Sequence, residues 1–170
     1  CLEMDYTAIK ELMEKDPGAA QQSRYIHDWA QYPLYRNSKT KYYPSGEARF
    51  VDMLGAMERA EKFIFLEYFI IEDGEMLQKM LAIMKRKVQE GVLVRLIYDD
   101  VGSIQTLPKH FTRDLKAMGI ETASFNPFRP ILSIILNNRD HRKILVVDGQ
   151  VGFTGGINIA DEYINKKERF

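Results

Sequence analysis

The chain has 170 residues, with 24 lysines and arginines balanced by 24 acidic residues, 45% hydrophobic residues and 28% charged residues. This length fits one ordinary domain with a substantial core, and the composition excludes an intrinsically disordered chain. A net charge of zero argues against a dedicated nucleic-acid-binding protein. A single cysteine excludes both a disulfide framework and a cysteine-based zinc site.

The two ends of the sequence indicate a piece of a longer protein. The chain begins at Cys1 rather than at a methionine, and it stops at Phe170 within a charged run. No apolar run approaches the roughly 18–20 residues that a bilayer span requires, and residues 2–15 are too acidic for a signal peptide. We therefore expect a soluble fragment.

The first 31 residues have a helical pattern. Apolar residues recur there at steps of three and four, namely Leu2, Tyr6, Ile9, Leu12 and Met13. Residues 16–18 (Asp-Pro-Gly) interrupt the pattern, and residues 19–29 resume it. The sequence thus predicts an N-terminal helical arm over residues 1–35, followed by a separate domain over residues 36–170.

The next segment changes character twice. Residues 36–45 contain three cations and no acid before a Pro-Ser-Gly sequence, which predicts a short strand and a turn. A helix follows, with Phe50, Leu54 and Met57 on one face. Residues 62–71 (KFIFLEYFII) are so apolar that they predict a central strand covered on both faces.

Helical and strand patterns then alternate. The sequence predicts helices over 74–89 and 108–118 and strands over 92–98 and 120–125, each helix ending before a glycine. Residues 126–138 form a predicted loop with an apolar patch at 131–136, which is either a packed connection or a contact surface for apolar matter. Two apolar runs, 143–148 and 151–154, predict a hairpin around Gly149-Gln150. This order indicates an α/β layered fold with a mixed sheet.

The chemistry is concentrated in one motif, H-x-K-x4-D-x6-G-G-x-N, which spans His141, Lys143, Asp148, the Gly155-Gly156 pair and Asn158. Strand alternation places the histidine and the lysine on the same face. A cation, amide donors and an imidazole that converge on one spot suit a phosphate group. His27 and His110 have no such neighbours, and we interpret them as ordinary structural residues.

This spacing resembles the HKD signature of the phospholipase D superfamily, and Gly156 in place of the usual serine resembles the cardiolipin synthase branch. Further segments are similar to bacterial cardiolipin synthases, namely residues 42–46, 65–74, 96–103, 137–143 and 158–163. The resemblance covers nearly the whole chain from about Tyr25 onward. It implies a phospholipase D-like fold, here incomplete at its C-terminus.

The resemblance also implies a mechanism. Members of the family pair two HKD motifs: one histidine attacks phosphorus to give a phosphohistidine, and the other protonates the leaving alcohol and activates the acceptor. By position, His141 would be the nucleophile, with Lys143, Asn158 and Gly156 at the phosphate oxygens. Asp148 belongs to the catalytic motif, but its place at the far end of the strand favours a structural role. The chemistry requires no metal and no organic cofactor.

The implied activity is the condensation of two phosphatidylglycerol molecules into cardiolipin and glycerol at the cytoplasmic face of a bacterial cell membrane. The implied partners are the lipid substrate, the membrane surface and a second HKD domain of the longer chain, but not nucleic acid. One motif supplies one imidazole, so we expect the isolated chain to be nearly inactive. Whether the fragment forms a homodimer is left open.

Two acids, Glu67 within one predicted strand and Asp99 directly after another, lie where the fold would direct them to one end of the sheet. Ligands of open α/β sheets gather at such strand ends. The two carboxylates therefore support the site through hydrogen bonds to nearby donors, or they are buried acids with a purely structural role, such as a helix N-cap.

Two other functions remain open. A single-HKD phosphodiesterase or endonuclease would pair two copies so that each contributes one histidine, and salt-dependent DNA binding would reveal it. A degenerate domain retained as a scaffold would be non-enzymatic, which the intact His141, Lys143 and Asn158 set disfavours. The context of the motif and the neutral charge favour the lipid-modifying enzyme over both.

Overall fold

The computed structural model describes residues 6–127 and 138–168. The chain divides into two compact units, Cys1–Tyr42 and Tyr43–Phe170. This division falls several residues later than the boundary after residue 35 that the sequence suggested. The predicted apolar patch at residues 131–136 lies outside the described residues.

The first unit is a helical hairpin of α1 (Thr7–Lys15) and α2 (Pro17–Ala30). Asp16 separates the helices and caps α2, because its carboxylate accepts a hydrogen bond of 3.0 Å from the Ala19 N–H. The helices pack through Tyr6, whose ring lies 4.7 Å from that of His27 and whose hydroxyl donates to Asp28. The two predicted helices and the break between them are confirmed.

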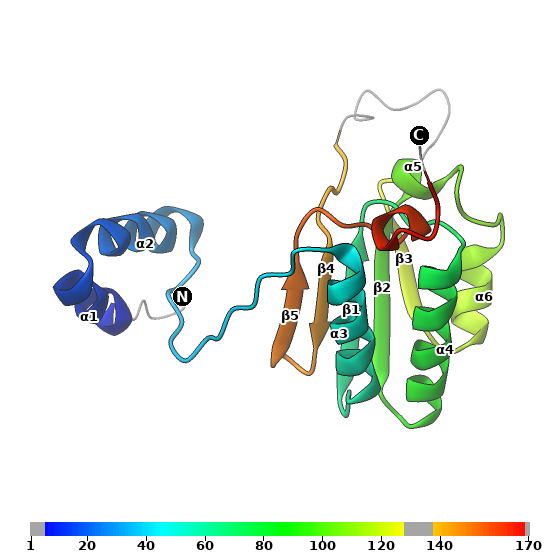
Figure 1. Ribbon diagram of the computed structural model, residues 1–170, viewed down its shortest axis with the longest axis horizontal. Coiled ribbons are helices and arrows are strands. Elements are labelled where there is room, and N and C mark those ends of the chain that lie inside the picture. The colour runs from blue at the N-terminus through cyan, green and yellow to red at the C-terminus, as the bar shows by residue number, and fades with distance from the viewer. Residues whose placement is uncertain (1–5, 128–137, 169–170) are drawn as a thin grey trace. The chain divides into compact units, whose positions relative to one another are not determined.

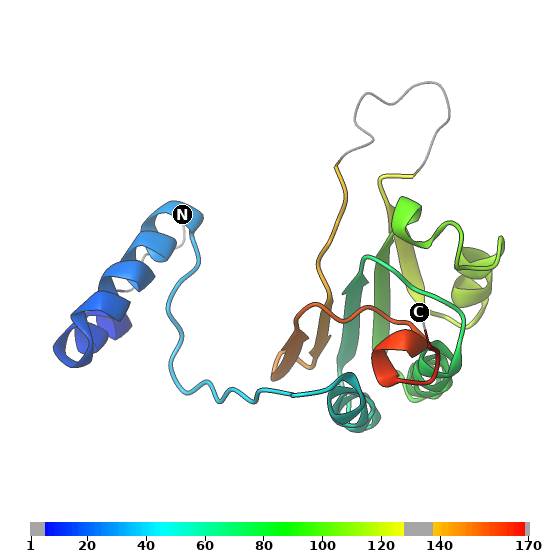
Figure 2. The same ribbon diagram turned by 45° about the horizontal axis from the view of Figure 1, so that its top comes forward.

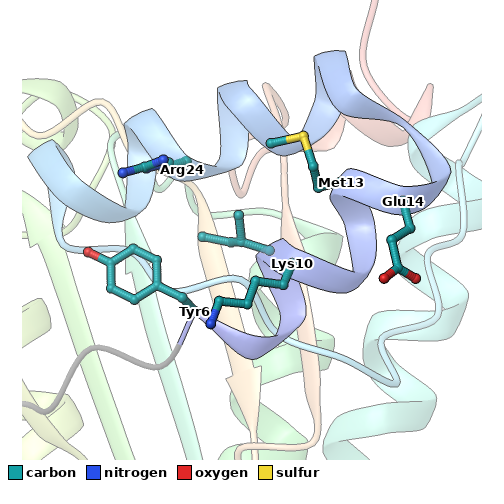
Figure 3. A pocket seen from close by; sticks show the side chains of 6 residues that line it. Tyr6, Lys10, Met13, Glu14 and Arg24 are labelled. Atoms are coloured by element: carbon teal, nitrogen blue, oxygen red, sulfur yellow. The ribbon is translucent and has the colours of Figure 1, made fainter.

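An open groove of about 530 Å³ runs along this hairpin. Figure 3 shows the side chains that line it, which come mainly from α1 and include Arg24 of α2. They are Tyr6, Ile9, Lys10, Met13, Glu14 and Arg24. Its lining combines apolar side chains with the charged Lys10, Glu14 and Arg24.

The second unit is built on a five-stranded sheet in the order β3-β2-β1-β4-β5 (Figure 1). The strands are β1 (Phe63–Tyr68), β2 (Leu93–Asp99), β3 (Glu121–Phe125), β4 (Ile144–Val147) and β5 (Val151–Thr154). The first three are parallel, whereas β4 and β5 form an antiparallel hairpin beside β1. The mixed sheet and the hairpin confirm the predicted α/β architecture.

Helices cover one face of this sheet, as the second view shows for α3 and α4 (Figure 2). They are α3 (Gly46–Glu58), α4 (Glu75–Gln89) and α6 (Phe111–Ala117), with the short α5 (Asp100–Ser103) and η1 (Asp161–Ile164) in the connections. The core lies between these helices and the strand residues that face them. Its largest fully buried members include Tyr68, Met53, Met57, Ile64, Leu77, Met80 and Leu96.

Two expectations about the strands were wrong. Residues 36–45 form no strand, because no neighbouring strand in the described chain supplies hydrogen-bond partners to them. β1 is central but not covered on both faces by described residues: Ile64 and Leu66 are buried against the helices, whereas Phe63 and Phe65 are only half-buried. An apolar run indicates burial without telling which element provides the cover.

The segment after β5 returns to β1 and fixes the helix that follows it. Ile159 bridges Ile71 in parallel fashion, and both oxygens of Asp161 accept backbone N–H groups at the start of α4, each at 2.8 Å. The N-cap of α4 is Gly74, where a Cβ would lie 2.5 Å from an Asp161 oxygen. A glycine there allows a distant carboxylate to cap the helix.

None of the helices in residues 6–127 and 138–168 combines the length and the apolarity needed to cross a membrane.

Candidate functional site

His141 lies in the extended segment that leads into β4. Because β4 runs antiparallel to β1, this segment reaches the end of β1, where Phe69 follows the strand. The exposed imidazole stacks on the Phe69 ring with a centroid distance of 3.8 Å and an interplanar angle of 21°. The ring is thus held by an aromatic surface while one side remains accessible.

Lys143 lies next to the same aromatic ring but is buried, with 8% of its surface exposed. Its Nζ lies 5.0 Å from the Phe69 centroid and donates a hydrogen bond to the backbone carbonyl oxygen of His141. Burial lowers the pKa of Lys143, and the charge of Asp140 opposes this shift. An ammonium has three N–H donors, so Lys143 retains the capacity to bind an anion.

Asn158 reaches the same place from the segment after β5. Its Oδ1 accepts the Ile70 N–H at 3.0 Å, and its Nδ2 donates to the Tyr163 hydroxyl at 3.0 Å. Asn158 is therefore buried beside the residue that follows Phe69, with one amide N–H still available. Gly156 is exposed, and a Cβ there would meet nothing within 4 Å. His141, Lys143 and Asn158 thus meet around residues 69 and 70.

Asp99, at the end of β2, anchors the histidine segment from one side. Its carboxylate is fully buried and accepts the Asp140 N–H and the Gly102 N–H, each at 2.9 Å. The Arg139 guanidinium lies 3.4 Å from the same carboxylate. Asp99 therefore caps α5, as one predicted alternative has it, and also holds the residue before His141. Its role in supporting a site stays a prediction.

Glu67 anchors the segment from the other side. Arg142 pairs with Glu67 at 2.5 Å and contacts Asp140 at 2.9 Å. Burial, followed by the hydrogen bond and the charge of Asp140, raises the pKa of Glu67 to about 7. Burial opposes ionisation of Asp140 as well, but hydrogen bonds with Glu67 and Arg142 lower its pKa to about 2. Glu67 therefore takes up a proton as the pH falls through about 7, whereas Asp140 stays ionised.

Asp148 lies at the opposite end of β4, away from the other motif residues. It has a positive φ of 55° in the turn between β4 and β5, and its carboxylate accepts three backbone N–H groups. The donors are the N–H groups of Glu61, Lys62 and Phe63, at 2.8–2.9 Å. These bonds lower the pKa of Asp148 and tie the hairpin turn to the start of β1.

Sequence reasoning missed Phe69, on which the imidazole stacks, and Asp140, which links the two anchors. Phe69 stood in an apolar run in which every side chain seemed to belong to the core. Asp140 directly precedes the motif histidine. Its backbone N–H donates to Asp99, and its carboxylate contacts Arg142. Only the pairing of the strands gives these two residues a role.

Comparisons with known proteins identify a family model and curated relatives that match most of this chain. Residues 53–168 match a family model described as cardiolipin synthase, PLD-like domain. An uncharacterised protein from Streptococcus mutans is 45% identical over 166 residues, which cover 98% of this chain and 36% of that protein. A cardiolipin synthase from Geobacillus kaustophilus is 42% identical over 141 residues, 82% of this chain and 28% of the enzyme. The chain spans about a third of the length of these curated relatives.

Two solved structures are similar in fold. NucT from Helicobacter pylori has a TM-score of 0.54 at 12% identity, covering 73% of this chain and 76% of NucT. Nuc from Salmonella typhimurium, a phospholipase D family member, has a TM-score of 0.53 at 21% identity, covering 73% of this chain and 72% of Nuc. These likenesses support the fold assigned from the strand order.

Proposed function

Because this chain belongs to the family of cardiolipin synthase PLD-like domains, we propose that it supplies half of the active site of a phosphatidyltransferase. The reaction condenses two phosphatidylglycerol molecules into cardiolipin and glycerol. The observation that carries the proposal is the exposed His141 imidazole, which stacks on Phe69 beside the buried Lys143 ammonium. A nucleophile and a cation so close together suit attack on a phosphodiester.

In the proposed reaction, an imidazole nitrogen of His141 forms a bond to phosphorus while the bond from phosphorus to the glycerol oxygen breaks. Negative charge stays on the non-bridging oxygens, where Lys143 and the remaining amide N–H of Asn158 stabilise it. The hydroxyl group of a second phosphatidylglycerol then attacks the phosphohistidine, which restores the free imidazole. Neither step requires a metal or an organic cofactor.

The leaving glycerol needs a proton, and the acceptor hydroxyl needs a base. A second imidazole would provide both, first as an acid and then as a base. We propose that a second HKD domain of a longer chain supplies it, as the length of the curated relatives suggests. A second copy of this chain is the alternative source, which would suit a homodimeric phosphodiesterase.

The proposal is tested with the full-length protein that carries this domain and with the 170-residue chain, each mixed with phosphatidylglycerol vesicles. The full-length protein should release glycerol and form cardiolipin, measured by mass spectrometry, and His141→Ala should reduce the rate at least about 1,000-fold. Val51→Ser, an exposed change on α3, is the matched control. The 170-residue chain should show little or no turnover.

Full activity in the His141→Ala protein would exclude the proposed nucleophile. Cleavage of DNA by the chain, with activity that rises as dimers form and falls with added salt, would favour the homodimeric phosphodiesterase instead.

Support for a membrane surface as partner comes from the helical hairpin and the segment after it. Among the described residues, five large exposed aromatic side chains lie between residues 25 and 42, namely Tyr25, Trp29, Tyr32, Tyr35 and Tyr42. Outside this segment, Phe125 is the exposed aromatic side chain of the described residues. The same segment carries cations at Arg36, Lys39 and Lys41 and no acid after Asp28. Aromatic rings and cations together suit an anionic bilayer surface. The proposed location is the cytoplasmic face of a bacterial cell membrane.

Trp29 is the single tryptophan of the chain and therefore reports directly on this contact. Vesicles with anionic phosphatidylglycerol should shift its fluorescence to shorter wavelength and protect it from aqueous quenchers, whereas phosphatidylcholine vesicles should do so far less. Lys39→Glu should weaken binding about fivefold or more, and the exposed Lys109→Glu should not. An unchanged spectrum with anionic vesicles would exclude this surface as the lipid contact.

A further inference from the structure

Arg49 is a buried cation that the proposed reaction does not yet use. It lies on the inner side of α3, with 4% of its surface exposed. Its Nη2 atom has no hydrogen-bond partner, and no carboxylate in the described part of the chain lies within ion-pair distance of it. Removing a charge from water without a counter-ion is unfavourable, so the guanidinium needs an explanation beyond packing.

The groups around Arg49 come from the end of the sheet that carries His141. Tyr68, the last residue of β1, is 1% exposed, and its hydroxyl also has no partner among the described residues. Burial raises the pKa of Tyr68 to about 12, and the charge of Arg49 opposes the shift. On the other side, the Arg49 Nη1 atom lies 3.6 Å from where a Cβ on Gly155 would stand. The guanidinium thus lies between β1 and the glycine pair of the motif.

Strand register brings Lys143 to the same place. β1 and β4 pair Glu67 with Ile144, and β4 and β5 pair Ile144 with Thr154. Continuing this register by one residue sets Tyr68, Lys143 and Gly155 in one row. The side chains of Tyr68 and Lys143 are both buried.

Lys143 and Arg49 are therefore both buried cations at this end of the sheet. Lys143 also makes no ion pair with a described carboxylate, and its Nζ hydrogen bond goes to a carbonyl oxygen. Two buried positive charges and an unpartnered hydroxyl at one strand end form a site for an anion with several oxygens. Gly155 and Gly156 are exposed, and Gly155 lies beside the Arg49 guanidinium.

We propose that Arg49 completes the phosphate site, with its guanidinium donating to the non-bridging oxygens of the phosphodiester that His141 attacks. A planar guanidinium binds two oxygens at once, whereas the Lys143 ammonium acts as a point charge. The pair therefore orients the phosphorus as well as neutralising it. The identity of the diester as a lipid headgroup rests on the proposed function, but binding of the anion does not require turnover.

The experiment titrates the 170-residue chain with dimethyl phosphate, inorganic phosphate or acetate at equal ionic strength and follows backbone amide signals by NMR. The two phosphate compounds should shift signals of residues near 49, 68, 143 and 155, and acetate should bind more weakly. Arg49→Met should reduce phosphate affinity at least about tenfold, Tyr68→Phe should reduce it less, and the exposed Lys109→Met should leave it unchanged.

Unfolding of the same variants without ligand gives the second measurement. Replacing an uncompensated buried charge with an apolar side chain of similar length should leave the urea midpoint of Arg49→Met equal to or above that of the unchanged chain. The same should hold for Tyr68→Phe, which removes only the unpartnered hydroxyl. A purely structural guanidinium would instead make Arg49→Met markedly less stable.

Three results would overturn the inference: unchanged phosphate affinity in Arg49→Met, acetate binding as strong as that of dimethyl phosphate, or loss of folding in Arg49→Met. If Arg49→Met does not fold, Tyr68→Phe still tests the site, because an unchanged phosphate affinity in Tyr68→Phe would count independently against it. Failure of the proposed function would give a different result. The full-length protein would then show no transferase activity, while the chain would still bind phosphate through Arg49.

Discussion

The two ends of β4 use polar side chains in opposite ways. At one end, the Asp148 carboxylate is satisfied by three backbone N–H groups, and its hairpin turn is tied to the start of β1. At the other end, the buried Lys143 and Arg49 have no carboxylate partner among the described residues, and the His141 imidazole is exposed.

This difference separates the structural part of the motif from its chemical part. Polar groups that the fold needs are matched with partners inside the chain, because an unmatched buried group weakens the folded state. Polar groups that bind a substrate must retain donors for it. The contrast predicts that substitutions at the Asp148 end affect stability alone, whereas those near His141 also affect the site.

The largest effect is expected at Asp99, the buried anchor of the His141 end. Asp99→Ala removes the acceptor of the Asp140 and Gly102 N–H groups and the partner of Arg139. We expect a loss of about 3 kcal/mol in the free energy of unfolding, measured in urea, because buried donors are left unsatisfied. Asp114→Ala, which removes an exposed pair with Arg113, is the control and should cost far less. Equal losses would show that Asp99 does not anchor the segment.

At the opposite end, Asp148→Ala should lower the free energy of unfolding by about 2 kcal/mol. Asp148→Asn retains an oxygen acceptor and tolerates the positive φ, so it should lose less. The lowered pKa of Asp148 contributes stability above the unfolded-state pKa, and this contribution disappears as the pH falls through the folded-state pKa. Urea unfolding at pH 7 and at pH 3 measures both effects. A change in phosphate binding by a folded Asp148 variant would contradict the contrast between the two ends.

Phe69→Leu tests the aromatic surface under His141. The stacked pair should contribute about 1 kcal/mol, so the expected loss of stability is smaller than at either aspartate. Because the Phe69 ring lies over the imidazole, the proton signals of His141 should be shifted upfield. Phe69→Leu should remove this shift. His110 serves as the internal reference in the same NMR spectrum. An unchanged His141 signal would mean that the stack does not form in solution.

The smallest effect is expected from Glu67, whose pKa is raised to about 7. This carboxyl contributes stability that is fully present below its unfolded-state pKa, near 4.3, and that is lost as the pH rises through about 7. Glu67→Gln should flatten the dependence of the free energy of unfolding on pH between about 5 and 8, measured in urea. The difference should be less than about 1 kcal/mol. Glu121→Gln, an exposed change on β3, should leave that dependence intact. A pH profile unaffected by Glu67→Gln would show that the Glu67 pKa is not raised in the folded chain.

The spacing of His141, Lys143 and Asn158 was sufficient to predict that they converge, and residues 69 and 70 contact all three. The predicted family is confirmed by the match over residues 53–168, and the predicted fold by the mixed sheet and its structural neighbours. The catalytic roles of the motif residues stay predictions, as do the domain boundaries. Asp148 belongs to the same spacing but lies at the far end of β4, as the length of the intervening strand requires.

The amino-acid sequence by itself determined the alternation of helices and strands, the hairpin and the motif, because periodicity and turn residues act over short distances. It could not determine which face of β1 is covered, since an apolar strand looks the same whichever element packs on it. It also gave Phe69, Asp140 and Arg49 no role, because their partners lie on other elements of the chain. Only the tertiary structure decided which polar groups are matched within the chain and which are left for a ligand, since that depends on long-range contacts.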